Sequence, residues 1–265
     1  MIDLHVHTAR CGHASGLLSE YVDAGRAAGL SVLTFTDHLP MPEGYPQHYT
    51  MRHDELPAYI AEVRAAAVVS AVRGGPEILC GIEADWLPDH VQWTRDLLGG
   101  LDLDMVLGSV HFIEDWAFDD PDLIERYGGW EIDALWDRYF SEVIAAARSG
   151  LFDVMAHPDL VKKFGFFAVS DPTDWYENAA LAMSEAGCAV EVSTAGLRKP
   201  VGEIYPTGAL LRACRRRGVP ATMGSDSHAP DEVAFGFDRA RALLREAGYD
   251  SLVVFRDRRA EEVAL

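Results

Sequence analysis

The sequence predicts a single α/β domain over residues 1–265, folded as a closed or nearly closed barrel of seven strand–helix units. The first observation is that short apolar runs rich in β-branched residues alternate with longer helical patterns along the chain, which indicates parallel strands joined by crossover helices. The second is that no Pro- or Ser-rich linker divides these units. A length of 265 residues also suits a barrel, which needs about 250. A doubly wound open sheet is the alternative.

Each strand of this barrel is predicted from a short apolar segment, and each helix from the longer segment that follows. The expected strands are residues 2–5, 31–36, 77–82, 105–110, 153–156, 189–193 and 220–224. The expected helices are residues 18–28, 54–72, 90–98, 131–148, 174–185, 208–217 and 231–247. Glycine follows many of these helices, as Gly29 and Gly74 do, and is the usual C-terminal stop signal.

Composition and charge exclude several classes of partner. There are 42 acidic and 23 basic residues, which gives a formal charge of −19. An acidic excess of this size argues against nucleic acids and anionic membranes, because phosphate contacts need clustered Lys and Arg. The four cysteines form no CxxC pair, and no apolar run approaches the ~18 residues of a membrane span. We therefore expect a cytoplasmic protein that acts on a small molecule.

Two connections, residues 39–52 and 112–130, are longer than ordinary loops between a strand and a helix. Long loops that follow strands in an α/β barrel usually shape the substrate pocket. We expect both to form walls of the active site.

Histidine and carboxylate side chains gather where the predicted strands end. These residues are His5, His7, His13, His38, Glu83, His111, His157, Asp226 and His228. In a barrel all these strand ends face one mouth, where active sites are built. The i, i+2 spacing of His5 and His7 places both rings on one side of a strand, so both can reach one ion.

Each of these residues alone is weak evidence, because a single strand-end histidine is more often structural. Together they predict a metal site, with Glu83 and Asp226 as carboxylates that can bridge cations. His53 and His90 fall outside the pattern and are interpreted as surface residues, whereas His48 could approach the pocket from the first long loop. The thiol of Cys11 is interpreted as structural.

The motifs around these residues resemble those of the polymerase and histidinol phosphatase (PHP) family of metal-dependent phosphoesterases, over essentially the whole chain. They are His-Val-His-Thr (5–8), Thr-Asp-His (36–38), Gly-Ile-Glu (81–83), Gly-Ser-Val-His (108–111), Ala-His-Pro (156–158) and Gly-Ser-Asp-Ser-His (224–228). The resemblance implies a distorted (β/α)7 TIM-like barrel with three divalent ions at the C-terminal end of the strands. The implied ligands are His5, His7, Glu83 and Asp226 for the first ion, Glu83, His111 and His157 for the second, and His13, His38 and His228 for the third.

Further motifs are similar to those of the histidinol-phosphatase branch of that family. They are Cys-Gly-His (11–13), Met-Arg (51–52), Lys-Lys-Phe-Gly (162–165), Ser-Thr-Ala-Gly-Leu-Arg-Lys-Pro (193–200) and Glu-Ile-Tyr-Pro (203–206). This branch implies hydrolysis of L-histidinol phosphate in histidine biosynthesis. The alternatives are a phosphodiesterase or nucleotide phosphatase of the same family and an amidohydrolase-like C–N hydrolase.

The chemistry of phosphate monoester hydrolysis suggests further site residues. Arg198, Lys163 or Lys162, and Arg52 are candidate phosphate-binding cations. Asp226 and His228 are candidate proton donors to the leaving group. Candidate recognition groups for the rest of the substrate are His48, Glu203, Glu43, Glu114 and Asp115. Asp3 and Asp37 are expected to orient ligand histidines. The mixed nitrogen and oxygen ligands suit zinc, iron and manganese alike, and the sequence does not determine an oligomeric state.

Overall fold

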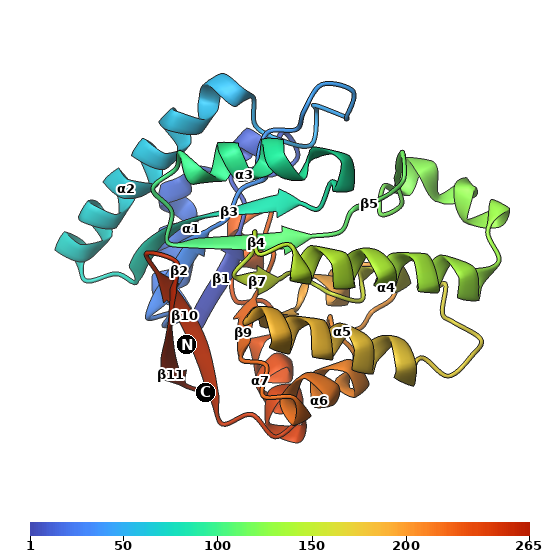
Figure 1. The fold of residues 1–265 in the computed structure, drawn as a ribbon. Coiled ribbons are helices and arrows are strands. Elements are labelled where there is room, and N and C mark those ends of the chain that lie inside the picture. The colour runs from blue at the N-terminus through green and yellow to red at the C-terminus, as the bar shows by residue number, and fades with distance from the viewer.

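The computed structural model describes residues 1–265 and has at its centre a sheet of seven parallel strands curled into a nearly closed barrel (Figure 1). The strands follow one another around the barrel in chain order. They are β1 (Ile2–Val6), β2 (Val32–Phe35), β3 (Glu77–Asp85), β4 (Met105–Ser109), β7 (Val154–Met155), β8 (Ala189–Ser193) and β9 (Ala221–Gly224). The predicted seven-unit α/β barrel is confirmed.

The barrel closes incompletely between its first and last strands. β1 and β9 share no continuous ladder, but Val6, the last residue of β1, forms a parallel bridge with Ser227, which lies just beyond β9. The backbone N–H of His7 donates to the carbonyl oxygen of Ser227 over 3.0 Å. The register between β1 and β2 also shifts between Asp3 and Val6. The barrel is therefore distorted at the strand that carries the His-Val-His motif.

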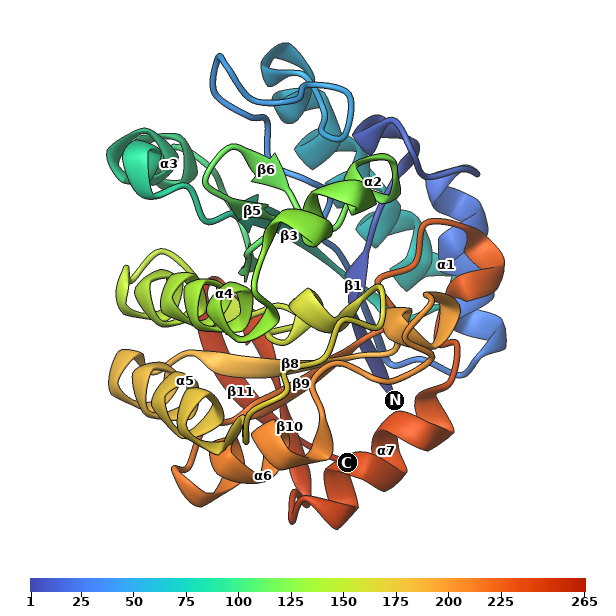
Figure 2. The same ribbon diagram turned by 90° about the vertical axis from the view of Figure 1, so that its right-hand side faces the viewer.

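Seven α-helices surround the barrel, as the end-on view in Figure 2 shows. They are α1 (Leu18–Ala27), α2 (Leu56–Arg73), α3 (Val91–Gly99), α4 (Ile132–Arg148), α5 (Thr173–Ala186), α6 (Gly208–Arg216) and α7 (Phe237–Glu246). The last helix begins six residues later than the predicted start at residue 231. The cause is a turn in which Ala234 and Gly236 adopt φ values of 58° and 69°, which a right-handed helix excludes.

Short 3₁₀ turns occupy several of the loops between strands and helices. They are η1 (Ala9–Cys11), η2 (His53–Glu55), η3 (Pro88–His90), η4 (Pro121–Gly129), η5 (Leu160–Lys162), η6 (Ala195–Arg198) and η7 (Pro230–Glu232). No α-helix combines the length and the apolar composition that crossing a bilayer requires.

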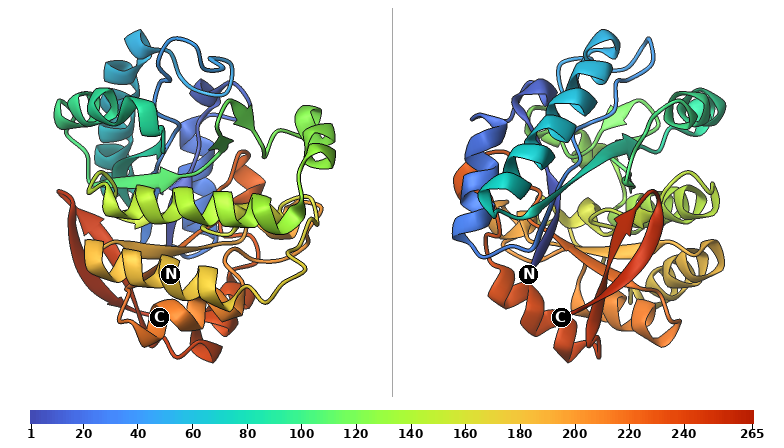
Figure 3. Two further views of the ribbon diagram at one scale, coloured as in Figure 1. Left: turned by 45° about the vertical axis from the view of Figure 1, so that its right-hand side comes forward. Right: turned by 90° about the vertical axis from the view of Figure 1, so that its left-hand side faces the viewer.

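Two β-hairpins were not predicted. The first, β5 (Phe112–Ile113) with β6 (Trp116–Ala117), lies inside the second long connection. The second, β10 (Ser251–Arg256) with β11 (Arg259–Ala264), ends the chain. The right-hand view of Figure 3 shows this C-terminal hairpin crossing the end of the barrel where the strands begin. The hairpin therefore covers the end opposite to the strand-end histidines.

Candidate metal centre and substrate pocket

All nine predicted metal ligands lie at the carboxyl-terminal end of the barrel, which faces the viewer in Figure 2. Parallel strands all end on the same side, so residues distant in sequence meet there. His5 and Glu83 lie within β1 and β3. The others follow strands: His7 and His13 after β1, His38 after β2, His111 after β4, His157 after β7, and Asp226 and His228 after β9.

The carboxylate of Glu83 is buried in the middle of this cluster. Its Oε2 atom lies 3.3 Å from Nε2 of His5 and 3.4 Å from Nε2 of His7. The same oxygen lies 3.1 Å from Nδ1 of His38. One oxygen of Glu83 therefore faces the histidines of β1 and of the loop after β2.

The other oxygen of Glu83 faces a second pair of histidines. Oε1 lies 3.0 Å from Nε2 of His157 and 3.8 Å from Nε2 of His111, and it accepts a hydrogen bond from the hydroxyl of Ser109. A carboxylate whose two oxygens face separate groups of ring nitrogens has the arrangement needed to bridge two cations.

Asp226 adds a second carboxylate to the cluster. Its Oδ1 atom lies 3.2 Å from Nε2 of His7, 3.7 Å from Nε2 of His5 and 3.5 Å from Nδ1 of His228. The backbone φ of Asp226 is 51°, a left-handed conformation that a non-glycine residue adopts at an energetic cost. This strained conformation in the loop after β9 directs the carboxylate toward the rings of His5 and His7.

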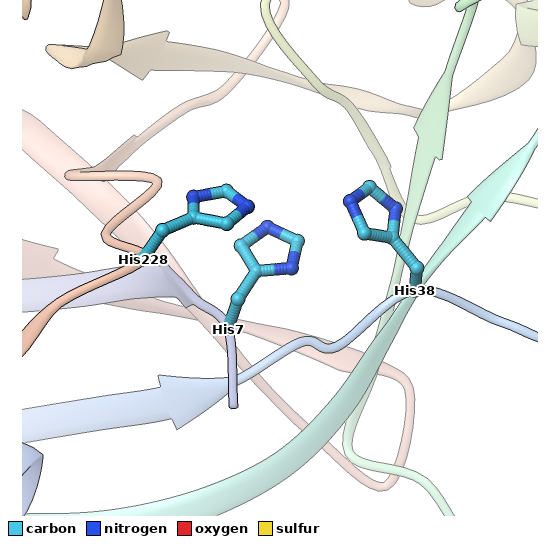
Figure 4. Close-up of side chains that lie close together, drawn as sticks. All are labelled: His7, His38 and His228. Carbon is cyan, nitrogen blue, oxygen red and sulfur yellow. The ribbon is translucent and has the colours of Figure 1, made fainter. Parts of the chain in front are cut away.

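A third group of rings surrounds His7 on the outer side of the cluster. Figure 4 shows His7, His38 and His228 converging from three separate loops, and their ligand nitrogens lie within 4.8 Å of one another. The ring centroid of His13 lies 4.6 Å from that of His228 and 5.5 Å from that of His38. These four histidines form one continuous face of imidazole rings.

The cluster is strongly coupled electrostatically. Burial alone would raise the pKa of Glu83, but His38 and His5 outweigh it and hold that pKa well below its usual range. The pKa of Asp226 is likewise lowered against the effect of burial, chiefly by His5 and His7. Burial lowers the pKa of His7, but its hydrogen bond to Asp226 and the other nearby carboxylates outweigh that effect and raise this pKa to about 9. The two carboxylates thus favour a proton on His7, which a bound cation would displace.

The donor set fits divalent cations. The Nε2 atoms of His5 and His7 lie only 3.0 Å apart, and Nε2 of His228 is buried without a hydrogen-bond partner. A buried nitrogen of this kind costs folding free energy, and a metal ion would supply the missing partner. Imidazole nitrogens combined with carboxylate oxygens suit zinc, iron or manganese. The structure therefore brings the predicted ligands together, while the ligation of each ion stays a prediction.

Two carboxylates that hold ligand histidines in place were not predicted. Glu191, in β8, accepts a hydrogen bond from Nδ1 of His5 over 2.7 Å and from the backbone N–H of His157 over 2.9 Å. Asp85, at the end of β3, accepts from Nδ1 of His111 over 2.8 Å. A proton fixed on Nδ1 leaves Nε2 free to bind a metal. β8 contributes no predicted ligand, but its Glu191 holds His5 and His157 in place. The sequence signal for this role was a carboxylate inside an otherwise apolar strand.

The two aspartates predicted to orient histidines have different surroundings. Asp37 lies 3.7 Å from Nδ1 of His7, too far for a hydrogen bond, and accepts the backbone N–H of Thr8, so its orienting role stays a prediction. Asp3 instead accepts both the backbone N–H and the hydroxyl of Ser225. Asp3 orients no ring; it fixes the loop that carries the candidate ligands after β9.

A cavity of about 300 Å³ lies against the cluster. Both long connections contribute to its walls, as predicted. The cavity is lined by His13, His38, Met41, Pro46, Tyr49, Thr50, Glu83, Asp85, His111, Phe112, Ala117, Asp119, Asp120, Pro121, His157, Leu160, Lys163, Ala195, Lys199, Tyr205, Asp226 and His228. The hydroxyl of Tyr49 donates to Asp120 over 2.9 Å and joins the two connections. The ammonium of Lys163 donates to the carboxylate of Asp119 over 3.0 Å.

Arg198 does not line this cavity. Its Nη2 atom donates to the carbonyl oxygens of Ser225 and Asp226, each over 2.9 Å, and its Nε lies 3.1 Å from Glu232. The guanidinium therefore supports the backbone of the loop after β9 instead of facing the cavity as predicted. Sequence could not show this, because the contact depends on how that loop folds back.

Three other predicted substrate-binding residues also lie outside the cavity lining. Arg52 is exposed and is bound to Asp54, and His48 is exposed on the first long connection. Glu203 accepts from Lys162 over 3.2 Å. Of the two candidate lysines, Lys162 is fully buried in this pair, and only Lys163 reaches the cavity.

The acidic residues beside the cavity are not the ones that were predicted to recognise the substrate. Glu43, Glu114 and Asp115 are exposed and line none of the cavity. The carboxylates of Asp119 and Asp120 take that place within the second long connection.

The fold and the site together define a seven-stranded α/β barrel with a candidate polynuclear metal centre at the C-terminal end of its strands. The chain belongs to the PHP domain family, whose sequence profile matches residues 3–195. It is similar over 98% of both chains, at 42% identity, to a protein of Deinococcus radiodurans named a probable histidinol-phosphatase. It is 27% identical to the histidinol-phosphatase of Bacillus subtilis, over 89% of this chain and 96% of that one.

Solved structures confirm the fold. The crystal structure of histidinol phosphate phosphatase from Lactococcus lactis, complexed with zinc, L-histidinol and phosphate, superposes with a TM-score of 0.85 over 98% of both chains at 20% identity. The crystal structure of a Listeria monocytogenes protein named a putative histidinol phosphatase superposes with a TM-score of 0.79 over 90% of this chain and 99% of that one, at 22% identity.

Proposed function

We propose that this protein is a metal-dependent phosphomonoesterase, a histidinol-phosphatase that hydrolyses L-histidinol phosphate to L-histidinol and phosphate in histidine biosynthesis. The observation that carries the proposal is the buried carboxylate of Glu83, whose two oxygens face two groups of histidines beside a cavity of about 300 Å³. The 42% identity over 98% of the Deinococcus protein supports the choice of substrate.

Three divalent ions are proposed, drawn from zinc, iron and manganese. The supporting observation is that the donors form three overlapping groups, around Glu83 Oε2, around Glu83 Oε1, and along the imidazole face of His7, His38 and His228. The proposed ligand sets are those stated for the sequence, with Glu83 shared by the first two ions. Such ions, when bound, lower the pKa of water to about 7 and neutralise the charge of the phosphoryl group.

The chain itself supplies substrate binding. Lys163 places a cation at the cavity beside Asp119, and an exchange of that partner for a phosphate oxygen would keep its charge paired. Met41 and Phe112 belong to a small apolar cluster on the wall of the cavity and offer a surface for an imidazole ring. The remaining carboxylate of the wall, Asp120, complements the ammonium of L-histidinol.

Asp226 and His228 both line the cavity, and we propose that one of them, protonated only transiently, passes the proton to the leaving alkoxide. Asp226 is ionised at rest, because its pKa lies well below the usual range, so its carboxylate would first take up that proton. Arg198 positions Asp226, because its guanidinium donates to the carbonyl oxygens of Ser225 and Asp226. Arg198→Met is therefore expected to lower kcat more than it raises KM.

The test is a comparison of phosphate release from L-histidinol phosphate, nucleoside monophosphates, nucleoside 3′,5′-bisphosphates and a phosphodiester, at equal enzyme and metal concentration. We expect kcat/KM for L-histidinol phosphate to exceed that for each nucleotide by at least ~100-fold, as recognition by a shaped polar pocket allows. Preference for a bisphosphate or a diester would show that L-histidinol phosphate is not the substrate, but it would leave phosphoester hydrolysis as the reaction. Turnover of none of them by the metal-loaded protein would reject phosphoester hydrolysis and favour hydrolysis of a C–N bond.

A further inference from the structure

The aromatic ring of Tyr205 forms part of the cavity wall, together with His157 and Asp226. Tyr205 is almost fully buried, and its backbone is fixed by two hydrogen bonds with Ser193 at the end of β8, over 3.0 and 2.7 Å. The segment around Tyr205 therefore continues the barrel wall beyond the strand and holds this residue beside the candidate metal ligands.

The surroundings of the ring leave it little freedom. The ring meets that of His157 edge-on, with centroids 6.4 Å apart, and the ammonium of Lys162 lies 5.4 Å from its centroid. Its hydroxyl-bearing edge lies over Gly196, where an added Cβ atom would come within 2.9 Å of Cε2 and Cζ of the ring. Glycine at that position lets the phenol ring lie flat against the backbone, so the direction of the hydroxyl is fixed by packing.

The hydroxyl of Tyr205 is buried and has no hydrogen-bond partner. Two other buried tyrosines differ: Tyr59 donates to the carbonyl of Gly81, and Tyr249 donates to the carbonyl of Val219. Burial raises the pKa of Tyr205, and the nearby carboxylates of the site raise it further, so the hydroxyl keeps its proton. Tyr205 lines the cavity, and a buried donor without a partner in a cavity-lining residue indicates an acceptor that arrives with the ligand.

We propose that the hydroxyl of Tyr205 donates a hydrogen bond to a phosphoryl oxygen of the bound phosphomonoester. This inference rests on the proposed function and names a phosphate-binding residue that motif spacing did not identify. A neutral donor suits this position, because bound divalent ions would already supply positive charge, and a fixed hydroxyl adds direction without a further buried cation. The contact is made with the substrate and with the phosphate product alike.

The test compares Tyr205→Phe with the parent, both as full-length metal-loaded protein. Isothermal titration calorimetry with inorganic phosphate measures the contact without turnover. A hydrogen bond to a charged oxygen predicts a roughly 10- to 100-fold higher Kd for phosphate in Tyr205→Phe. The Kd for L-histidinol should change less than about twofold. Metal content and Tm should be unchanged, since the hydroxyl has no partner within the protein to lose.

Tyr127→Phe is the matched control. The hydroxyl of Tyr127 is also buried and unpartnered, but this residue does not line the cavity. Its removal should leave the Kd for phosphate unchanged. An equal loss in both variants, or a loss of bound metal in Tyr205→Phe, would show a structural effect and overturn the inference.

Failure of the inference and failure of the proposed function remain distinguishable. If the parent binds phosphate but does not hydrolyse L-histidinol phosphate, the substrate is wrong, and the calorimetric comparison still decides the role of Tyr205. If L-histidinol phosphate is hydrolysed and Tyr205→Phe binds phosphate as tightly as the parent, the role of Tyr205 is wrong and the function stands.

Discussion

The carboxylate of Glu191 links two candidate ligands that come from different strands. It accepts from the ring of His5 with one oxygen and from the backbone of His157 with the other. Burial keeps water away from both contacts. The ring of His5 is thereby held with Nε2 toward Glu83, so the orientation of a ligand in β1 depends on a residue 186 positions later in the chain.

Substitution of Glu191 by Gln tests this dependence. The amide can accept from His5 or from the backbone of His157, but its NH₂ end has no acceptor in the other position. We expect metal affinity to fall about 10- to 100-fold, as for other residues that orient metal ligands. Metal titration against a competing chelator measures the effect. Glu185→Gln is the control, because that carboxylate is exposed and pairs only with Arg148; an unchanged affinity in Glu191→Gln would contradict the account.

The adjacent lysines Lys162 and Lys163 differ in role: Lys162 stabilises the fold, and Lys163 faces the cavity. Lys162 is buried and paired with Asp159 over 3.0 Å. Lys162→Met should lower the free energy of unfolding by about 3–5 kcal/mol, because it leaves a buried carboxylate without its cation. Lys163→Met should leave stability within about 1 kcal/mol and raise KM about tenfold. Urea unfolding and steady-state kinetics on both variants separate the two effects. Equal kinetic defects at equal stability would refute the distinction.

At the scale of elements, the end of β9 lies against β1 and β8 closely enough to exclude a side chain. An added Cβ atom at Gly224 would lie 2.4 Å from Oε1 of Glu191 and 2.5 Å from Cβ of His5. Neither neighbour can move without breaking the hydrogen bond between them. Glycine at this strand end is therefore a condition for bringing three strands together at the metal centre.

Gly224→Ala should accordingly reduce metal binding at least tenfold and lower Tm by several degrees. Metal analysis after gel filtration and a thermal melt would measure both. Gly99→Ala, at the end of α3, is the matched control, because a Cβ there meets nothing within 4 Å and φ is not positive. A Gly224→Ala protein that retained the parent's metal content would show that the strand ends are less tightly packed than described.

The strand ends were predictable because the chain order of the units equals their spatial order. Residues such as His38 and His157 could be placed at the same end of the barrel from sequence, since every parallel strand ends at the same mouth. Glu191 was missed because it lies within a strand, between apolar neighbours, where sequence gives no partner. Arg52 was misplaced because the path of its connection depends on packing between distant segments.

In the whole molecule, the candidate active site and the structure that closes the barrel lie at opposite ends. The candidate metal centre occupies one end of the barrel, and the β10–β11 hairpin covers the other (Figure 3). Neither strand of this hairpin was predicted. The residues of β11 are polar and mostly exposed, and β10 buries Val254 and Phe255 against the barrel. Arg258 of the turn between them donates to the carboxylate of Asp153, just before β7.

Phe255→Ala tests this separation. Loss of a buried phenyl ring should lower the free energy of unfolding by about 3–5 kcal/mol. Because the ring lies at the end opposite to the metal centre, kcat and KM of the folded variant should stay within about twofold of the parent. Urea unfolding and steady-state kinetics at a temperature well below Tm provide both numbers. A large kinetic defect in the fully folded variant would mean that the two ends of the barrel are coupled.

We propose that a cluster of divalent ions, held by the strand-end histidines and carboxylates, makes this protein a phosphomonoesterase. The most direct measurement is release of inorganic phosphate from L-histidinol phosphate by chelator-treated protein during stepwise return of zinc, iron or manganese, with bound metal per chain determined at each step. We predict negligible turnover by the metal-free protein and recovery that rises with occupancy up to three ions per chain. Full turnover without metal, or three bound ions without turnover of any phosphomonoester, would contradict the account.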